Sequence, residues 1–164
     1  MSATATPREV FERLIGAISS GGWAELAELY AEDAVVEIPF APFPPRRLEG
    51  RAQLKERFEA LGERGEIELQ AKNVVVRRTD DPEVIVAEFD YTGRYPATGR
   101  TFEVPNIQVL RVREGRIVHT RDFHDHLAFA AAGDALPHLI SAYESANEST
   151  SESTSESTSD SAVD

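Results

Sequence analysis

The fold is decided by residues 100–129, which read RTFEVPNIQVLRVREGRIVHTRDFHDHLAF. Two runs of alternating residue types flank Glu114-Gly115, and this pattern predicts two long strands joined by a hairpin turn. Successive side chains of a strand point to opposite faces. One face of the second strand then carries a polar row, Thr120, Asp122, His124 and His126, and the other carries Arg121, Phe123, Asp125 and Leu127. A carboxylate and two imidazoles on one face make this row the first candidate for a functional site.

The rest of the chain places this hairpin in an α+β fold. Two further strand patterns precede it, over 67–78 and 83–94, with breaks at 80–82 and 95–99. Helical spacing of apolar residues predicts helices over 7–19, 23–30 and 51–62, with a strand over 34–40 between them. Prolines predict a loop over 42–50, and Gly133 and Pro137 interrupt a final helical segment over 127–142. Helices followed by a run of four antiparallel strands indicate an α+β fold, because a doubly wound fold alternates the two.

Composition limits the possible functions. The 164 residues, of which 41% are hydrophobic, suit one domain over 1–143. The chain has no cysteine, so disulfides, thiol catalysis and thiolate metal sites are excluded. The net charge is −12 and no basic patch stands out, so we expect no binding to nucleic acid or to an anionic membrane. The start resembles no signal peptide and no apolar run could span a bilayer, so we expect a soluble cytoplasmic protein.

Residues 144–164 read ESANESTSESTSESTSDSAVD and differ from the rest of the chain. They hold six acidic residues, no basic residue and no large apolar side chain except Val163. Such a segment cannot bury enough surface to offset the entropy lost on ordering. We therefore expect a disordered acidic tail that keeps the protein soluble, with a phosphorylatable or interaction tail as the alternative.

Four stretches carry a resemblance to a known superfamily: WAELAELYAEDAVVEIP (23–39), GRAQLKERFEAL (50–61), TGRTFEVP (98–105) and EGRIVHTRDFHDHLAF (114–129). In order and spacing they resemble the nuclear transport factor 2-like superfamily, which includes SnoaL-like polyketide cyclases, steroid isomerases and limonene-epoxide hydrolases. The resemblance covers about residues 7–129. It implies a cone-shaped α+β barrel, in which a curved antiparallel sheet wraps on three N-terminal helices around one mostly apolar pocket. It also implies that the sheet's outer surface often forms a homodimer.

The resemblance can be tested at the residues that carry each family's chemistry. Ile38, Gln108 and Leu14 stand where steroid isomerases have their base, their protonated acid and their phenol, so that mechanism is disfavoured. Asp122 matches a catalytic acid of the epoxide hydrolases, but that mechanism also needs an Arg two residues from a second Asp. Residues 87–91 read AEFDY, and alternation places Glu88 and Asp90 outside the pocket if Phe89 is inside. SnoaL-like proteins commonly use an Asp or His late in the chain. Asp122 with His124 fits this last group.

We therefore predict a site on the inner face of the sheet, with Asp122 as general acid/base and His124 as its partner. Gln108 and Asn106 would donate to an oxyanion and Tyr91 would orient the ligand. The full set of expected substrate-binding residues is Tyr91, Asn106, Gln108, Phe40, Phe58, Phe89 and Thr120. Alternatively, Asp122 and His124 only hydrogen-bond each other and water at a wet cavity mouth.

The other histidines and Trp23 are interpreted without a catalytic role. His126 is expected to be exposed at the strand end, His119 to face outward and His138 to lie on a surface loop. Successive same-face residues stand about 6–7 Å apart, so Asp122, His124 and His126 cannot easily share one ion, and no metal or cofactor is expected. Trp23 is interpreted as helix packing.

Two functions remain open. The first is an enzyme that binds an apolar oxygenated small molecule and acts by cofactor-free acid/base chemistry, as an isomerase, cyclase, dehydratase or epoxide hydrolase. The second is a non-catalytic ligand-binding or dimerisation module of the same fold. A buried catalytic pair open to a sizeable cavity would favour the enzyme, and a cavity filled by side chains would favour the module.

Overall fold

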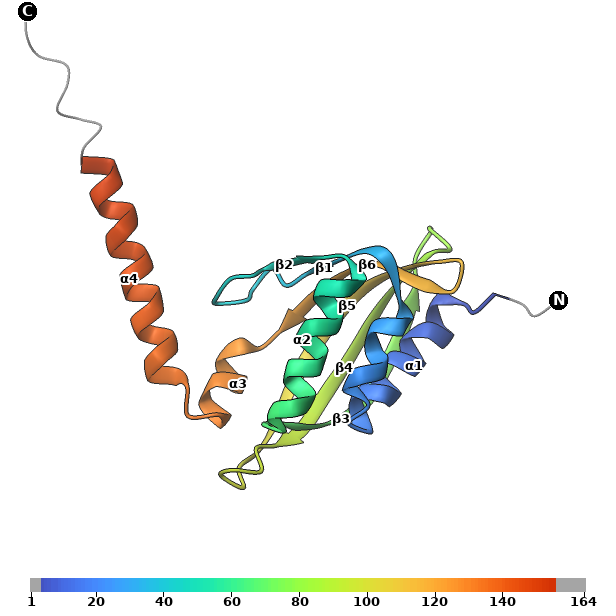
Figure 1. The fold of residues 1–164 in the computed structure, drawn as a ribbon, viewed down its shortest axis with the longest axis horizontal. Helices are drawn as coiled ribbons and strands as arrows, with labels where there is room; N and C mark the ends of the chain where they lie inside the picture. Colours follow the sequence, from blue (N-terminus) through green and yellow to red (C-terminus); the bar gives the residue numbers. More distant parts are fainter. Residues whose placement is uncertain (1–3, 156–164) are drawn as a thin grey trace, which may run out of the picture.

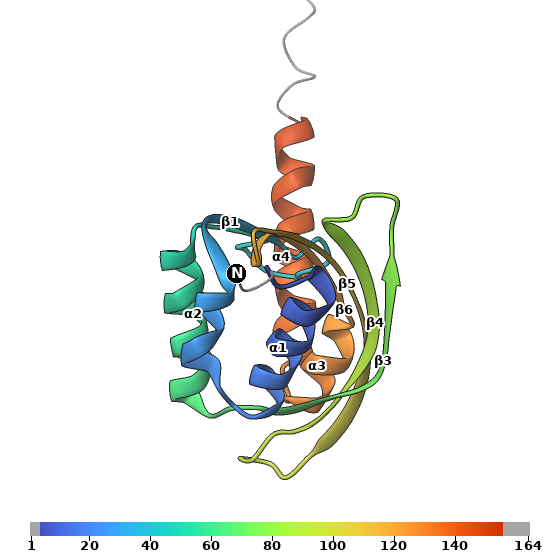
Figure 2. The same ribbon diagram turned by 90° about the vertical axis from the view of Figure 1, so that its right-hand side faces the viewer.

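The computed structural model describes residues 4–155, with side chains described through residue 146 except at 64. A six-stranded sheet of order β2-β1-β6-β5-β4-β3 curves around the helices without closing (Figures 1 and 2). Its strands are β1 (Tyr30–Glu37), β2 (Arg47–Glu49), β3 (Glu68–Arg78), β4 (Val84–Arg94), β5 (Thr101–Arg113) and β6 (Arg116–His124). The helices are α1 (Pro7–Ser19), the 3₁₀ helix η1 (Trp23–Leu29), α2 (Arg51–Arg64), α3 (His126–Ala132) and α4 (Leu136–Ser155). The structure thus has the predicted α+β architecture.

Local sequence signals explain where α1 begins and which face it buries. Thr6 and Glu9 form a capping box: the Thr6 hydroxyl accepts from the Glu9 N–H at 3.3 Å and the Glu9 carboxylate accepts from the Thr6 N–H at 2.7 Å. Pro7 occupies the first helical position, where its missing N–H costs nothing. Val10, Phe11 and Leu14 are buried against the sheet. This packing fixes one wall of the molecule's interior.

The inner face of the sheet follows the predicted alternation. Every second residue of β4 from Ile85 to Tyr91 is buried, and so are Val104, Asn106, Gln108 and Leu110 of β5. The register sets β5 directly against β6, with Gln108 opposite Asp122 and Asn106 opposite His124. The polar row predicted on β6 therefore lies next to two buried amides.

Several sequence predictions need correction. Residues 47–49 of the predicted loop form β2, because Leu48 pairs with Val36 and is buried. The sheet is antiparallel except that β1 runs parallel to β6. The second helix is a 3₁₀ helix that ends at Leu29, and α2 extends to Arg64, next to Gly65 in a left-handed conformation (φ 56°). Periodicity predicts a strand or a helix but not which neighbour a strand pairs with.

The C-terminal part is more helical than predicted. Gly133 ends α3, whereas Pro137 lies in the first turn of α4, where a missing N–H is tolerated, and His138 is an exposed residue of that helix instead of a loop. The backbone of α4 continues through Ser155, so residues 144–155 of the expected disordered tail are helical in the structure (Figure 1). Residues 156–164 lie outside the described part, and the disordered tail stays a prediction. None of the described helices is long and apolar enough to cross a membrane.

Candidate functional site

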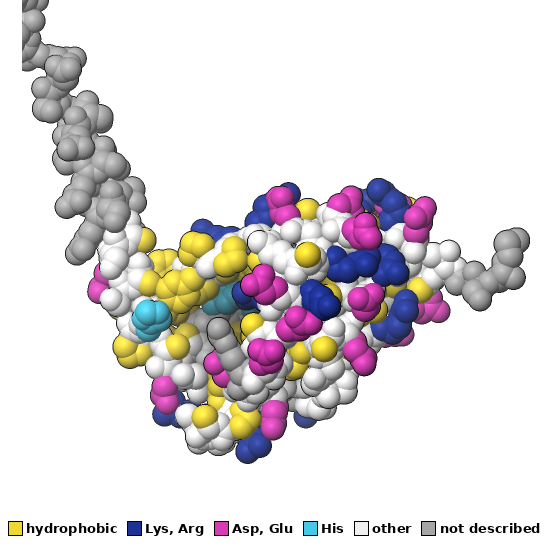
Figure 3. Space-filling model, viewed as in Figure 1, with side chains coloured by type: hydrophobic (Ala, Val, Ile, Leu, Met, Phe, Trp, Pro, Cys, Tyr) yellow, Lys and Arg dark blue, Asp and Glu magenta, His cyan; other side chains and the backbone are white. Residues whose placement is uncertain are grey.

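A partly enclosed cavity of about 340 Å³, called the enclosed cavity below, lies between the inner face of the sheet and the helices α1, η1 and α2. Its wall is mostly apolar and includes Leu14, Leu54, Phe58, Leu69 and Phe89. Asp122, His124 and Gln108 from the sheet reach it, together with Tyr30 and Tyr91. On the face shown in Figure 3, hydrophobic side chains gather around a recessed histidine. The cavity has a mostly apolar lining with a few polar groups, as small-molecule binding sites do.

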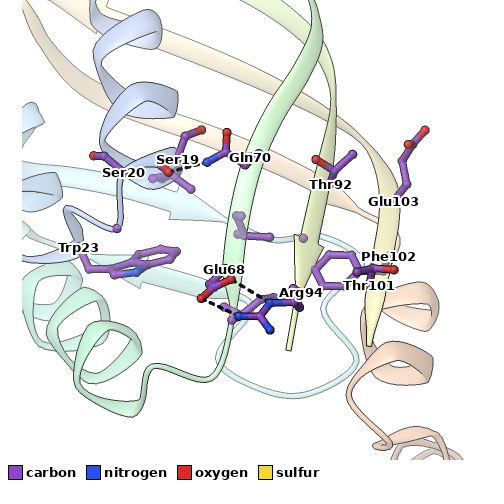
Figure 4. Close-up of a pocket in the computed structure, with 15 residues that line it drawn as sticks. Ser19, Ser20, Trp23, Glu68, Gln70, Thr92, Arg94, Thr101, Phe102 and Glu103 are labelled. Atoms are coloured by element: carbon purple, nitrogen blue, oxygen red, sulfur yellow. Dashed lines mark hydrogen bonds and ion pairs between the residues drawn. The ribbon is translucent and has the colours of Figure 1, made fainter. Parts of the chain in front are cut away.

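A larger and more open groove of about 870 Å³ lies at the end of β3, β4 and β5 (Figure 4). Its polar groups satisfy one another: Glu68 and Arg94 form an exposed ion pair, and the Gln70 amide donates to the Ser19 carbonyl at 3.0 Å. It shares Trp23 and Leu69 with the enclosed cavity. Because its charged pair is already neutralised and exposed, we place the site in the enclosed cavity.

Asp122 is a partly buried carboxyl in the cavity wall whose pKa lies near neutrality. Burial raises its pKa from the ordinary 3.8 to about 6. The rise is limited by Gln108, whose side-chain N–H donates to Asp122 Oδ1 at 2.7 Å, by the Thr120 hydroxyl and by the charge of His119. At pH 7 the group is therefore mainly a carboxylate, but a more basic one than an exposed Asp.

His124 is held in one tautomer by its neighbour across the sheet. The Asn106 amide donates to the Val104 carbonyl at 2.8 Å, so its oxygen faces His124 Nδ1 at 2.6 Å. An amide oxygen only accepts hydrogen bonds, and this network therefore assigns the proton to Nδ1 and a free lone pair to Nε2. Burial lowers the pKa of His124 to about 4. The ring is neutral at pH 7 and can accept a hydrogen bond from a ligand.

Asp122 and His124 do not bond to each other as expected. Both side chains line the cavity, but no hydrogen bond joins them within the described structure. Each is bonded instead to the residue directly opposite on β5, because same-face neighbours on one strand are about 6–7 Å apart. The site is therefore built from two cross-strand pairs, Gln108–Asp122 and Asn106–His124.

Two tyrosines complete the polar part of the cavity. Burial raises the pKa of both Tyr30 and Tyr91, and the charge of Asp122 raises each further, which places both phenols in the field of that carboxylate. Neither hydroxyl hydrogen-bonds to another residue of the described chain. Both therefore remain protonated and available as donors. Tyr91 is among the predicted site residues, whereas Tyr30 is not.

The other predicted residues divide into those that reach the cavity and those that do not. Phe58, Phe89 and Gln108 line it. Thr120 and Asn106 are buried and do not line the cavity. Asn106 supports His124, whereas the buried Thr120 hydroxyl has no hydrogen-bond partner in the described structure.

Phe40 does not line the cavity, although it lines a neighbouring hollow that His124 and His126 also reach. Its side chain is 64% exposed, and its ring packs on Phe123 at a centroid distance of 5.4 Å. The strand ends at Glu37, and a turn closed by the Ala41 N–H to the Ile38 carbonyl directs Phe40 outward. Ile38 lines the cavity in its place.

The predictions for His126 and Trp23 also change. His126 was expected to be exposed, but it starts α3, lines the cavity and has a buried Nε2 with no hydrogen-bond partner in the described structure. The Asp125 side chain caps α3 by accepting from the Ala128 N–H at 2.9 Å, and this turn of the chain carries the His126 ring inward.

Trp23 lines the cavity in addition to the predicted helix packing. His119 faces outward as predicted and pairs with Glu37 at 3.1 Å. No group of three or more His, Asp or Glu side chains among the described residues could hold a metal ion.

Because burial alone lowers the pKa of His124, we predict that Asp122→Asn leaves the titration of His124 nearly unchanged. NMR of the imidazole signals should show a midpoint near pH 4 in the wild type and in the variant. Asn106→Leu serves as the comparison, since it removes the hydrogen bond that fixes the tautomer. A further fall of the His124 pKa in Asp122→Asn would show instead that the carboxylate stabilises the charged ring.

The curved, open sheet over helices and one enclosed cavity define the cone-shaped class of α+β proteins. Residues 11–120 match the SnoaL-like domain model, and because this is more than half of the chain, the protein belongs to the SnoaL-like family.

Named relatives share this fold. The chain is 34% identical over 107 residues to the Bacillus subtilis "Uncharacterized protein YesE", covering 64% of this chain and 71% of that protein. It is similar, with 28% identity and a TM-score of 0.71, to the crystal structure of a "Putative Isomerase" from Bacillus subtilis, covering 79% of this chain and 93% of that one. A "putative polyketide cyclase" from Xanthomonas campestris shares the fold, with a TM-score of 0.65, 21% identity and coverage of 77% and 96%.

Proposed function

We propose that the protein is an enzyme that rearranges an apolar, oxygenated small molecule by acid/base chemistry without a cofactor. The observation that supports this most is Asp122, a partly buried carboxyl with a pKa of about 6, lining a mostly apolar cavity of about 340 Å³. A general base works best when its pKa lies near the working pH. The names of two similar structures, an isomerase and a polyketide cyclase, fit this class of reaction.

The residues suggest a sequence of proton transfers. The Asp122 carboxylate takes a proton from a carbon next to a carbonyl, and the electron pair of that C–H bond moves to the carbonyl oxygen. Tyr30 or Tyr91 donates a hydrogen bond to this developing enolate oxygen. His124 Nε2 accepts from a hydroxyl of the substrate and orients it. Return of the proton from Asp122 to another carbon completes an isomerisation. In a ring closure the enolate carbon attacks a second carbonyl, and the oxygen of that carbonyl takes the proton from Asp122 to form a hydroxyl.

Proton exchange tests this proposal without knowledge of the natural substrate. The protein is incubated in D₂O with one- and two-ring ketones, and deuterium incorporation next to the carbonyl is followed by NMR. We expect exchange well above the buffer rate for at least one ketone, and loss of that exchange in Asp122→Asn. The matched control is Asp90→Asn, which makes the same change at an Asp that bonds Asn73 outside the cavity. Ketones that bind without any Asp122-dependent exchange would favour the binding-module alternative.

We also propose that the protein forms a homodimer through the outer face of its sheet. Ile107 of β5 pairs with Phe123 of β6, and the Phe40 ring packs on Phe123, which makes a continuous apolar strip. Ile107 is 45% and Phe40 64% exposed. Apolar strips of this kind mark protein interfaces.

Sedimentation equilibrium tests the dimer. We expect twice the chain mass for the wild type and the mass of one chain for Ile107→Glu. Ile140→Glu, at a 55% exposed position on α4 away from this strip, should leave the dimer intact. A wild type that sediments as a single chain contradicts the proposal.

A further inference from the structure

Arg57 is the one Lys or Arg among the described residues that line the enclosed cavity. It lies on α2 within a stripe formed by Leu54, Phe58 and Leu61, all of which face the cavity. Residues three and four apart share a face of a helix, so Arg57 stands in the middle of an apolar stripe. Arg57 is exposed overall and also lines a surface hollow next to Glu56, so it lies at the rim of the cavity between inside and outside.

No group of the described protein neutralises this charge. Arg57 has neither an ion pair nor a hydrogen bond to any residue whose side chain the structure describes. The positions three and four away on α2 are Gln53, Leu54, Ala60 and Leu61, none of which is acidic. Its neighbours on the same helix are engaged, since Arg51 donates to the Tyr30 carbonyl at 2.8 Å and Lys55 pairs with Glu59 at 3.8 Å. A free guanidinium at the mouth of an apolar cavity is available to a ligand.

We propose that the substrate is a carboxylic acid, bound with its carboxylate on Arg57 and its reacting carbonyl beside Asp122. This inference rests on the proposed function and names the substrate class. The planar guanidinium fork matches a carboxylate with two parallel hydrogen bonds. A single cation suits a single negative charge better than a phosphate, which carries nearly two.

Electrostatics fixes the direction in which such a molecule binds. Asp122 is mainly ionised at pH 7 and repels a second carboxylate, so the acid group lies at the Arg57 end. The net charge of the chain is −12, so its long-range field disfavours anions. Any preference for an acid over a neutral analogue must therefore come from a local group, and Arg57 is that group.

The test compares a keto acid with its neutral counterpart. 3-Benzoylpropionic acid and its primary amide have the same ring and ketone and differ only in charge. Binding is measured by calorimetry at pH 7.5, and deuterium exchange next to the ketone gives KM and kcat. We expect the wild type to bind the acid about tenfold more tightly than the amide, as for a partly exposed charge-assisted pair. The preference should appear in KM and not in kcat.

The variants assign this preference to Arg57. Arg57→Gln should bind both probes equally, with affinity for the amide unchanged, and Arg57→Lys should keep part of the preference because it keeps the charge. Arg78→Gln is the matched control, because Arg78 is also exposed and unpaired among the described residues but lines a separate hollow. Circular dichroism and thermal unfolding establish that each variant folds.

The possible results distinguish failure of the carboxylate inference from failure of the proposed function. Equal binding of acid and amide by the wild type, or a preference that survives in Arg57→Gln, overturns the carboxylate proposal alone, provided that Asp122-dependent exchange is seen. Failure of the acid, the amide and the ketone panel to bind contradicts both proposals.

Discussion

Asp122→Asn is expected to slow proton exchange by about 10²–10⁴-fold, the usual contribution of a general acid or base. The asparagine oxygen can still accept from Gln108 at the position of Oδ1, so the cross-strand pair and the fold should persist. What the amide cannot do is take up a proton. In the wild type, kcat/KM should rise as pH increases through about 6, because the base form of Asp122 appears there. The variant should show no such rise in a profile from pH 4.5 to 8.5.

The same substitution should stabilise the protein. The pKa of Asp122 is raised in the folded state, so the carboxylate opposes folding at neutral pH, and this cost disappears as pH falls below the ordinary value of 3.8. A rise to about 6 corresponds to about 2–3 kcal/mol. Urea unfolding at pH 7 and at pH 4 should therefore show a more stable variant at the higher pH and a smaller difference at the lower one. A variant that is less stable at pH 7 contradicts the burial cost assigned to Asp122.

Phe11→Ala is expected to lower the free energy of unfolding by about 3–5 kcal/mol, the range for an aromatic residue removed from a core. Phe11 has no exposed surface, and its ring lies 5.5 Å from that of Phe89. Its loss leaves a void directly behind a wall of the cavity. Ile140→Ala removes a large apolar side chain at a position on α4 that is 55% exposed, and it should cost less than about 0.5 kcal/mol. Similar losses in the two variants by urea unfolding would contradict the assignment of Phe11 to the core.

Period-two alternation made the inner face of the sheet predictable. A strand that presents Asp122 to one side presents His124 to the same side, whatever the partner strands are. Long strands with clear turns also gave the bounds of β3 to β6 to within one or two residues, apart from the end of β6. The α+β class followed from the order of these elements, because it requires no knowledge of which strands pair.

The sequence-based predictions fail where the chain changes direction and where hydrogen-bond partners come from distant segments of the chain. Phe40 and His126 both lie just beyond a strand end, where alternation stops and a local turn decides the direction of the side chain. The hydrogen-bond partners of Asp122 and His124 depend on the register with β5, which periodicity does not fix. Arg57 was not predicted because one charge in an apolar helical stripe is ordinarily an exposed residue.

The position of β6 also bears on how the protein folds during synthesis. β6 is the last strand of the sheet in the sequence, yet it lies in the interior of the sheet, between β1 and β5. A ribosome that has released only β1 to β5 has therefore produced two separate groups of strands with no bridge between them. Closing the parallel pair of β1 and β6 joins segments far apart in the chain, which is a slow step in folding. Asp122 and His124 lie on this strand, so the chemistry of the site is assembled only when nearly the whole domain has left the ribosome.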